Sequence, residues 1–244
     1  MNQHALFQSL SVRLIALIAS FTVIFQALSP WKAAQPDQTG FHYLAIGNSI
    51  TRHPVCEYWW NESGMAASTA ENDYFHLVTA YLRERFDAVT AQAVNFVEWE
   101  VSEKDRAATY AVIDPYLTDD LDLITLQLSE NARYSRAFGA DYADLARHIR
   151  EKCPQAALIL VDDFWDAAKS RSKQKAARSL GLPFASLKAI RGDDAYMWQI
   201  GDIVYDAEGM PHAIDRADVA RHPNDAGMRF IAEMIISKIK KAIK

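Results

Sequence analysis

A serine, an asparagine and a histidine occupy positions in this sequence at which they could together carry out acyl transfer. Ser49 follows an apolar run, Asn131 lies in a Ser-Glu-Asn-Ala segment, and His222 precedes the last helical pattern. A serine needs a base to take its proton during attack, and histidine has a suitable pKa near neutral pH. A side-chain amide and a backbone N–H can stabilise the oxyanion that forms. Acyl transfer is the reaction class that uses all of these groups.

The elements that must position these residues alternate between strand and helix. Strand-like apolar runs lie at residues 41–47, 88–99, 121–128, 156–161 and 182–187. Helices are predicted at residues 72–82, 103–113, 140–151, 169–180 and 225–243, and residues 190–221 are predicted to be irregular. This alternation predicts βαβ units with right-handed crossovers. We therefore expect an α/β fold with a central parallel sheet of about five strands, covered on both faces by helices.

The strand-to-helix loops of a parallel sheet meet at its carboxyl edge, where ligands bind. The loops after residues 46, 99, 128 and 161 should therefore converge, with the His222 loop beside them. Gly47 is expected to allow a sharp turn before Ser49, because glycine can take backbone angles that other residues avoid. Each residue alone also fits a structural role, and Asn131 in particular is a common turn former. Their shared edge is what favours a catalytic site.

Three motifs resemble blocks of the SGNH (GDSL-type) hydrolase superfamily. Gly47-Asn48-Ser49-Ile50 is similar to its GDS(L/I) block, with Asn48 in place of aspartate. Ser129-Glu130-Asn131 is similar to the GxN of its GxND block, and His222 followed by Pro223 resembles its carboxyl-terminal histidine block. The resemblance extends from residue 41 to the end of the chain. It implies a flavodoxin-like, three-layer α/β/α fold.

The resemblance also implies roles for individual residues. Ser49 would be the nucleophile and His222 the base, while Asn131 and the Ser49 N–H would form the oxyanion hole. The family usually carries its acid three residues before the histidine, whereas Asp218 lies four before His222. We expect Asp218 to be the acid; the alternatives are Asp215, Asp225 and a main-chain carbonyl.

The family's second oxyanion block supplies a glycine that residues 94–99 lack. A backbone N–H in that segment, or Gly64, is the expected replacement. Aromatic side chains at the predicted edge suit stacking against a sugar or lining an acyl pocket, although they could also belong to the core. The candidate substrate-binding residues are Trp59, Trp60, Glu98 and Trp165.

The composition excludes some other classes of protein. The chain has 244 residues, a formal net charge of -5 and a pI of about 5.8, which argues against a nucleic-acid-binding surface. Its two cysteines, Cys56 and Cys153, form no CxxC motif and are expected at opposite ends of the sheet, so no disulfide is predicted. Acidic residues 162, 163 and 166 have no histidines at ligand spacing. We therefore expect no metal and no cofactor.

The amino terminus differs from the rest of the chain. The first 12 residues have no acidic group, Arg13 follows, and residues 14–28 are almost wholly apolar. We predict that residues 1–36 are a signal peptide or membrane anchor with a linker, and that residues 37–244 form the hydrolase domain. The apolar run is short against the ~20 residues of a spanning helix, and a buried amino-terminal helix is the alternative. Export implies a periplasmic, secreted or membrane-anchored protein.

Together these patterns predict a serine esterase that uses a Ser-His(-Asp) acyl-enzyme mechanism. The expected substrate is a small-molecule or polysaccharide ester, in particular an O-acetyl group on an extracellular or cell-surface carbohydrate. The alternatives are a lipase or lysophospholipase, and a non-catalytic carbohydrate-binding protein on the same fold. Fold alone does not choose among them.

Overall fold

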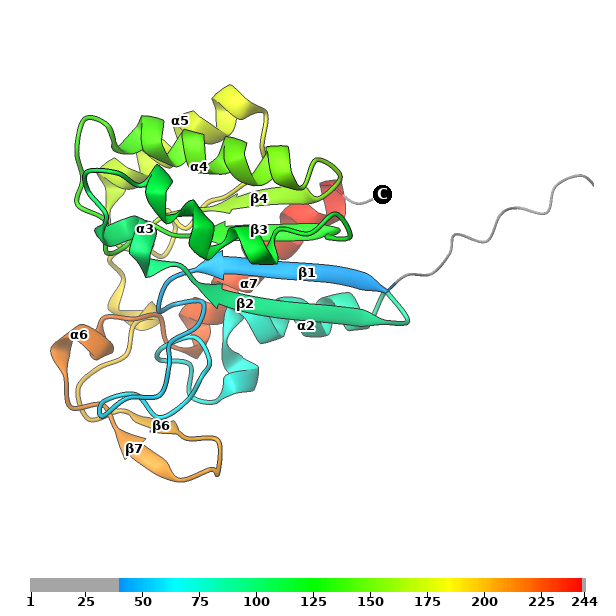
Figure 1. The fold of residues 1–244 in the computed structure, drawn as a ribbon. Helices are drawn as coiled ribbons and strands as arrows, with labels where there is room; N and C mark the ends of the chain where they lie inside the picture. Colours follow the sequence, from blue (N-terminus) through cyan, green and yellow to red (C-terminus); the bar gives the residue numbers. More distant parts are fainter. Residues whose placement is uncertain (1–39, 243–244) are drawn as a thin grey trace, which may run out of the picture. The chain divides into compact units, whose positions relative to one another are not determined.

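Five parallel strands in the order β2-β1-β3-β4-β5 form the central sheet of the computed structural model, which describes residues 40–242 (Figure 1). The strands are β1 (Phe41–Gly47), β2 (Val89–Asn95), β3 (Leu123–Gln127), β4 (Ala157–Val161) and β5 (Phe184–Ala185). The predicted parallel sheet is confirmed. The predicted signal or anchor segment, residues 1–36, lies outside the described residues. Within residues 40–242, no helix has the length and apolar character needed to cross a membrane.

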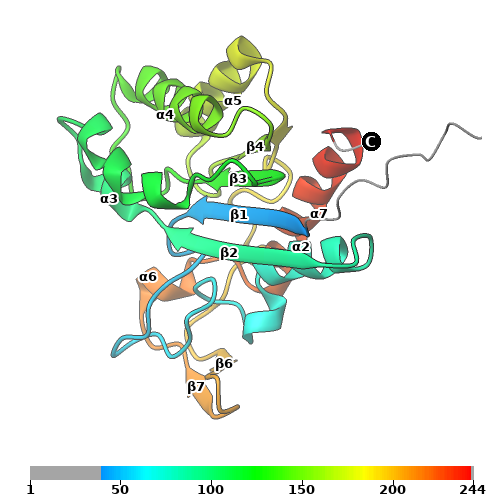
Figure 2. The ribbon, with the colours of Figure 1, turned by 45° about the vertical axis from the view of Figure 1, so that its right-hand side comes forward.

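Helices cover both faces of this sheet, as Figures 1 and 2 show. One layer contains α4 (Phe138–Lys152) and α5 (Ala167–Leu180), and the other contains α2 (Tyr74–Arg83) and α7 (Asp225–Ala242). The architecture is therefore the predicted three-layer α/β/α sandwich.

Strand β1 shows why the layers form. Alternate side chains of a strand point to opposite faces of the sheet. Leu44 and Ile46 pack in the core under α4 and α5. Tyr43 and Ala45 pack in the core under α2 and α7. All four are at most 1% exposed, so β1 is a central strand buried on both faces, and its carboxyl end is fixed where Ser49 follows.

Two helices begin at aspartate caps, and one of these aspartates also holds a loop at the carboxyl edge. Asp73 caps α2 by accepting from the His76 N–H at 2.7 Å, and its other oxygen accepts from the Gly64 N–H at 2.9 Å. Asp166 caps α5 by accepting from the N–H groups of Ala168 and Lys169. Such caps satisfy N–H groups that have no partner inside the helix.

Three segments differ from the sequence-based prediction. Residues 97–101 form a short helix, α3 (Val97–Val101), where we expected the end of a strand. Valine and tryptophan favour strands, but the Asn95 side chain accepts from the Val97 N–H at 3.0 Å and turns the chain out of the sheet. The helix predicted at 103–113 is a 3-10 turn, η2 (Ala107–Val112).

The third difference lies in residues 190–221, which are more regular than predicted. They contain an antiparallel hairpin of β6 (Ile203–Tyr205) and β7 (Pro211–Ala213), followed by α6 (Ala217–Ala220). The remaining 3-10 turns are η1 (Ala70–Asn72), η3 (Asp114–Tyr116) and η4 (Asp194–Tyr196). Helix α6 leads directly into the His222 loop at the carboxyl end of the sheet (Figure 1).

Candidate active site

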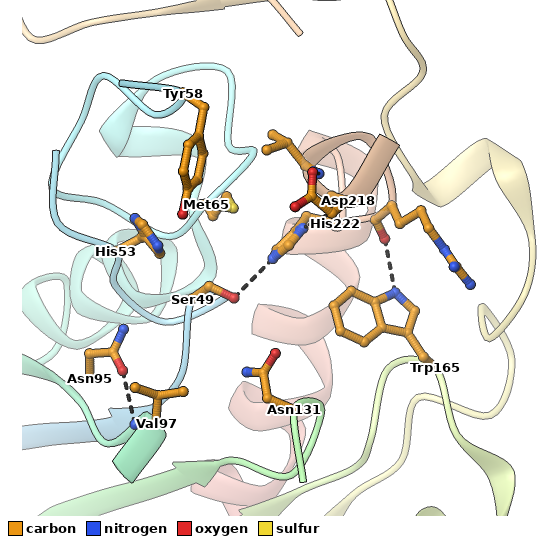
Figure 3. Close-up of a pocket in the computed structure, with 12 residues that line it drawn as sticks. Ser49, His53, Tyr58, Met65, Asn95, Val97, Asn131, Trp165, Asp218 and His222 are labelled. Atoms are coloured by element: carbon orange, nitrogen blue, oxygen red, sulfur yellow. Dashed lines mark hydrogen bonds between the residues drawn. The ribbon is translucent and has the colours of Figure 1, made fainter. Parts of the chain in front are cut away.

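Ser49 and His222 are in contact at the carboxyl edge, although they lie 173 residues apart in the sequence. The Ser49 Oγ is 2.9 Å from the Nε2 of His222, as Figure 3 shows. That distance is within the range expected for a nucleophile and its base. The Trp165 ring packs edge-on against the imidazole, with 5.3 Å between ring centroids.

Gly47 sets the course of the chain into Ser49, but not in the way we predicted. Its backbone is not among those with positive φ, so an unusual backbone angle is not what it provides. A Cβ at this position would instead collide with the Thr51 side chain and the Gln127 carbonyl. Gly47 is needed because the turn carrying Ser49 passes directly against β3.

The second imidazole nitrogen contacts the main chain. The Nδ1 of His222 lies 2.9 Å from the main-chain carbonyl oxygen of Asp218, in a turn that begins in α6. A carbonyl can only accept, so Nδ1 carries the proton and donates it to this bond. Nε2 is then left unprotonated and can accept from the Ser49 hydroxyl. This is the tautomer that a general base requires.

The expected role of the Asp218 carboxylate is wrong. The carboxylate is 65% exposed and pairs with the Arg216 guanidinium through contacts of 3.0 and 2.7 Å. This ion pair holds the pKa of Asp218 down to about 2. Among our alternatives, Asp225 accepts instead from Ser68, Asp215 is exposed and does not line the pocket, and the main-chain carbonyl occupies the position of the acid.

Burial sets the protonation state of His222. The residue is 7% exposed, and desolvation lowers its pKa to about 4, against the smaller opposing effect of the Asp218 carbonyl. Desolvation acts in this direction because it penalises the charged imidazolium. His222 is therefore neutral at physiological pH and able to accept a proton.

Asn131 lines the same pocket as Ser49 and His222 (Figure 3). Its Nδ2 donates to Oε2 of Glu100 at 2.6 Å, and because an amide nitrogen carries two hydrogens, one remains for a ligand. The Ser49 N–H has no hydrogen-bond partner within residues 40–242. These two groups can serve as oxyanion donors.

The expected third oxyanion donor is not where we predicted it. The Gly64 N–H donates to Asp73, so Gly64 is not available to a ligand. In the segment after β2, the Phe96 N–H donates to the Gly47 carbonyl at 2.6 Å and the Val97 N–H to Asn95. The Gly64 prediction is therefore wrong, and the Phe96 and Val97 N–H groups are likewise already used to hold the loops together.

A cavity of about 440 Å³ opens above Ser49. Of the four candidate substrate-binding residues, only Trp165 lines it. Trp59 is 1% exposed and belongs to a small core cluster, Trp60 stacks on His212 with 4.3 Å between ring centroids, and Glu98 is exposed on α3 outside the lining. For those three residues the prediction is wrong.

Several residues that line the cavity were not singled out from the sequence. They are His53, Tyr58, Met65, Asn95, Val97, Val219 and Arg221. His53 and Tyr58 come from the loop that leaves Ser49, so a loop of this length after the nucleophile could have indicated them. Asn95 ends the strand beside β1, which places it at the carboxyl edge.

Sequence reasoning also missed a buried group of charges beneath Asn131. Glu100 and Glu130 both accept from the Asn48 side-chain amide, at 2.9 and 2.7 Å. Lys169 and Lys173 lie behind them, and Lys169 Nζ donates to the carbonyls of residues 129, 130 and 132. Burial, and next the charge of Asp163, raise the pKa of Glu130 to about 7. No cluster suited to a metal ion occurs within the described part of the chain.

The sequence matches no protein-family profile and no curated protein. The fold is similar to that of a two-domain esterase active on acetylated mannans, crystallised with mannopentaose, at 17% identity and a TM-score of 0.53 over 82% of this chain. It is also similar to LAE5, an alpha/beta hydrolase from the metagenome of Lake Arreo, at 14% identity and a TM-score of 0.53, over 84% of this chain and 97% of LAE5.

Phospholipase A1 from Streptomyces albidoflavus NA297 is similar at 11% identity and a TM-score of 0.50, over 82% of this chain and 99% of that enzyme. This chain spans about half the length of the mannan esterase, with 50% of that chain covered. At these identities the likeness describes the fold, and it agrees with the three-layer architecture observed here.

Proposed function

We propose that the protein is a serine ester hydrolase of the SGNH type, with Ser49 as nucleophile and His222 as general base. The observation that carries the proposal is the 2.9 Å contact between Ser49 Oγ and His222 Nε2, on an imidazole whose other nitrogen is held by a carbonyl. A buried neutral histidine against an accessible serine hydroxyl is the arrangement that activates a weak nucleophile.

The chemistry follows from this geometry. Ser49 Oγ forms a bond to the ester carbonyl carbon while His222 Nε2 takes the hydroxyl proton. The negative charge on the carbonyl oxygen is met by the second Asn131 N–H and the Ser49 N–H. When the C–O bond to the alcohol breaks, the imidazolium returns its proton to the leaving oxygen. Water, deprotonated by His222, then hydrolyses the acyl-enzyme and frees Ser49.

The substrate class we favour is an O-acetylated carbohydrate. A second cavity, of about 390 Å³, shares Trp165 and Arg221 with the catalytic one. Trp198, Asp194 and Gln199 also line it. An indole face beside exposed carboxylate, amide and guanidinium groups suits a sugar ring, which has apolar faces and hydroxyl edges. The two adjoining cavities would take the acylated sugar and its neighbour. The likeness to an esterase active on acetylated mannans makes acetylated manno-oligosaccharides the first substrates to test.

Hydrolysis of p-nitrophenyl acetate by the wild type and by Ser49→Ala tests the nucleophile. We expect the variant to lose activity, while Ser237→Ala on α7, a matched substitution away from the cavity, retains it. Equal rates for wild type and Ser49→Ala would refute the proposal. A folded wild type that hydrolyses no ester but binds oligosaccharides would identify the non-catalytic carbohydrate-binding protein instead.

Acyl-chain length and a second-cavity variant test the substrate class. A carbohydrate deacetylase should prefer acetyl to octanoyl p-nitrophenyl esters, whereas a lipase or lysophospholipase should show the reverse. Gln199→Ala should reduce kcat/KM for acetylated oligosaccharides and leave p-nitrophenyl acetate hydrolysis unchanged. If both substrates respond alike, the second cavity does not bind the sugar.

We also propose that residues 1–36 direct export, on the basis of their charge and apolar pattern. Mass spectrometry of the protein recovered from cell fractions would identify its amino terminus. An intact terminus on a protein confined to the cytoplasm would exclude export, and an intact terminus in the membrane fraction would indicate an uncleaved anchor.

A further inference from the structure

The Asn131 side chain must hold one orientation to act as an oxyanion donor, yet it lies in the loop after β3 and is exposed. Its amide is held by Glu100, which comes from α3 and is fully buried. Glu100 Oε2 accepts from Asn131 Nδ2 at 2.6 Å. Glu100 Oε1 accepts from the Ser129 N–H at 2.5 Å and from Asn48 Nδ2 at 2.9 Å. One carboxylate therefore joins the Asn131 loop to the turn that carries Ser49.

We propose that Glu100 is the positioning residue of the oxyanion site, where it fixes the rotation of the Asn131 amide and its distance from Ser49. This inference rests on the proposed function, because it assigns Glu100 a role through Asn131. No role of this kind follows from the position of Glu100 in the sequence.

The chemistry of the contacts explains why a carboxylate is required. Every group that faces Glu100 in these three bonds is an N–H donor, and an ionised carboxylate is a side chain that only accepts. It forces the Nδ2 of Asn131, rather than Oδ1, toward the protein. The second hydrogen on Nδ2 is then set in a fixed direction. A glutamine at position 100 would turn its own NH₂ toward at least one of these donors.

Backbone strain shows that the loop is held against a local preference. Ser129 has a φ of 142°, in a region that favours glycine. The GxND block that this segment resembles has glycine at this position. Here the Ser129 N–H is bound by Glu100, its Oγ donates to Asp163 at 2.7 Å, and its carbonyl accepts from Lys169 at 2.8 Å. Strained residues persist where surrounding contacts determine their conformation, which is the role Glu100 plays at this end of the loop.

The negative charge of Glu100 would by itself disfavour catalysis at this position. A carboxylate near a developing oxyanion opposes the negative charge, so its benefit must come through orientation. Lys169 and Lys173, both buried, lie behind the loop and supply positive charge on its far side. The Glu100 carboxylate can therefore accept from the Asn131 amide while the two lysines offset its negative charge.

A double-mutant cycle between Glu100→Gln and Asn131→Ala tests this role. Glu100→Gln alone should lower kcat for p-nitrophenyl acetate by roughly 10–100-fold, at or below the roughly 10²–10³-fold loss expected when an oxyanion donor is removed outright, with KM little changed. In the Asn131→Ala background the same substitution should have almost no further effect, because residues that act through one another are not additive. An equal loss in both backgrounds, or a change in KM alone, would overturn the inference.

Glu130→Gln is the matched control, since Glu130 also contacts Asn48 but not the Asn131 side chain. It should leave kcat close to the wild-type value; a loss equal to that of Glu100→Gln would show that any disturbance of the network has this effect. If Glu100→Gln does not fold, NMR of the wild type gives an independent test. The Asn131 side-chain amide should show one strongly downfield proton, and two ordinary amide shifts would refute the contact. Neither result depends on the outcome for Ser49→Ala, which tests the proposed function itself.

Discussion

His222 and Asn131 both lie beside Ser49 (Figure 3), and the structure holds these two side chains in opposite ways. On the histidine side, the imidazole is backed by a neutral main-chain carbonyl, and the nearby Asp218 carboxylate turns outward to Arg216. On the asparagine side, the amide is backed by a buried carboxylate, Glu100. The negative charge expected behind the base thus lies behind the oxyanion donor instead.

This difference separates two tasks that a triad carboxylate usually combines. Such a carboxylate orients the histidine and also stabilises the imidazolium. The Asp218 carbonyl can orient His222 and fix its tautomer, but it contributes only a dipole to the cation. The main chain therefore orients His222 but places little negative charge beside it, and substitutions on the two sides of Ser49 can show whether catalysis depends on that arrangement.

The largest effect should come from His222→Gln. Glutamine fills similar space but cannot take the Ser49 proton, so kcat for p-nitrophenyl acetate should fall by roughly 10⁴-fold or more, as it does when a serine protease loses its base. Stopped assays on purified protein, with His148→Gln as a control far from the cavity, provide the measurement. A loss below about tenfold would show that another group acts as base.

Asn131→Ala should have the next largest effect. Loss of one oxyanion donor lowers kcat by roughly 10²–10³-fold, with KM nearly unchanged because the donor acts mainly in the transition state. Steady-state kinetics with p-nitrophenyl acetate measure both constants. If only KM rises, Asn131 binds the substrate in its ground state. The Glu100 carboxylate that holds the Asn131 amide then has no role in stabilising the oxyanion.

The pH dependence of the reaction should reflect the burial of His222. Burial lowers the pKa of His222 to about 4, so the base is protonated only in acid. We expect kcat/KM to stay level as pH falls from 7 toward 5 and to drop about tenfold per unit below the pKa. Glu130→Gln is the control, because burial raises the pKa of Glu130 to about 7. An acid limb near 6.5 in both proteins would contradict the prediction.

Stability should change in the same pH range. Unfolded His222 takes up a proton near its ordinary pKa of 6.5, whereas the folded residue does so only near 4. The unfolded state therefore binds more protons between these values, and the contribution of His222 makes the folded protein less stable as pH falls from 6.5 to 4. Urea unfolding of wild type and His222→Gln should show a smaller loss in the variant.

The smallest effect should come from Asp218→Asn. The carbonyl that holds His222 remains, and the lost partner of Arg216 is exposed, so kcat should stay within about threefold of wild type. An acid of a triad loses roughly 10⁴-fold on the same substitution. Parallel assays of Asp215→Asn give the matched control. A large loss confined to Asp218→Asn would mean that its carboxylate turns inward during catalysis.

The sequence predicts the layers of this fold because apolar periodicity is a local property. Leu44 and Ile46 alternate with Tyr43 and Ala45, and a strand buried on both faces follows directly. Ser49, Asn131 and His222 could be placed together because the topology of a parallel sheet brings their loops to one edge. The topology does not determine the direction in which each side chain points at that edge.

What could not be predicted depends on side-chain partners rather than pattern. Asp218 has nearly the right spacing from His222, but Arg216, two residues away, holds its carboxylate at the surface. Glu100 and Glu130 would be assigned to the surface by residue type, since buried glutamates need several donors that only the folded loops supply. Trp59 and Trp60 have the composition of a binding loop, yet packing within that loop removes them from the cavity.

Because the main-chain carbonyl of Asp218 holds His222, substitutions at residue 218 would not reveal this contact. An alanine scan removes side chains and leaves every main-chain oxygen in place, so it would report residue 218 as dispensable. If the carbonyl alone holds His222, selection on side-chain identity should likewise be weak there, and a change of residue at this position need not mark loss of function. In a collection of related sequences, a missing acid before the histidine would not identify an inactive protein, provided that the short α6 helix and its turn are retained.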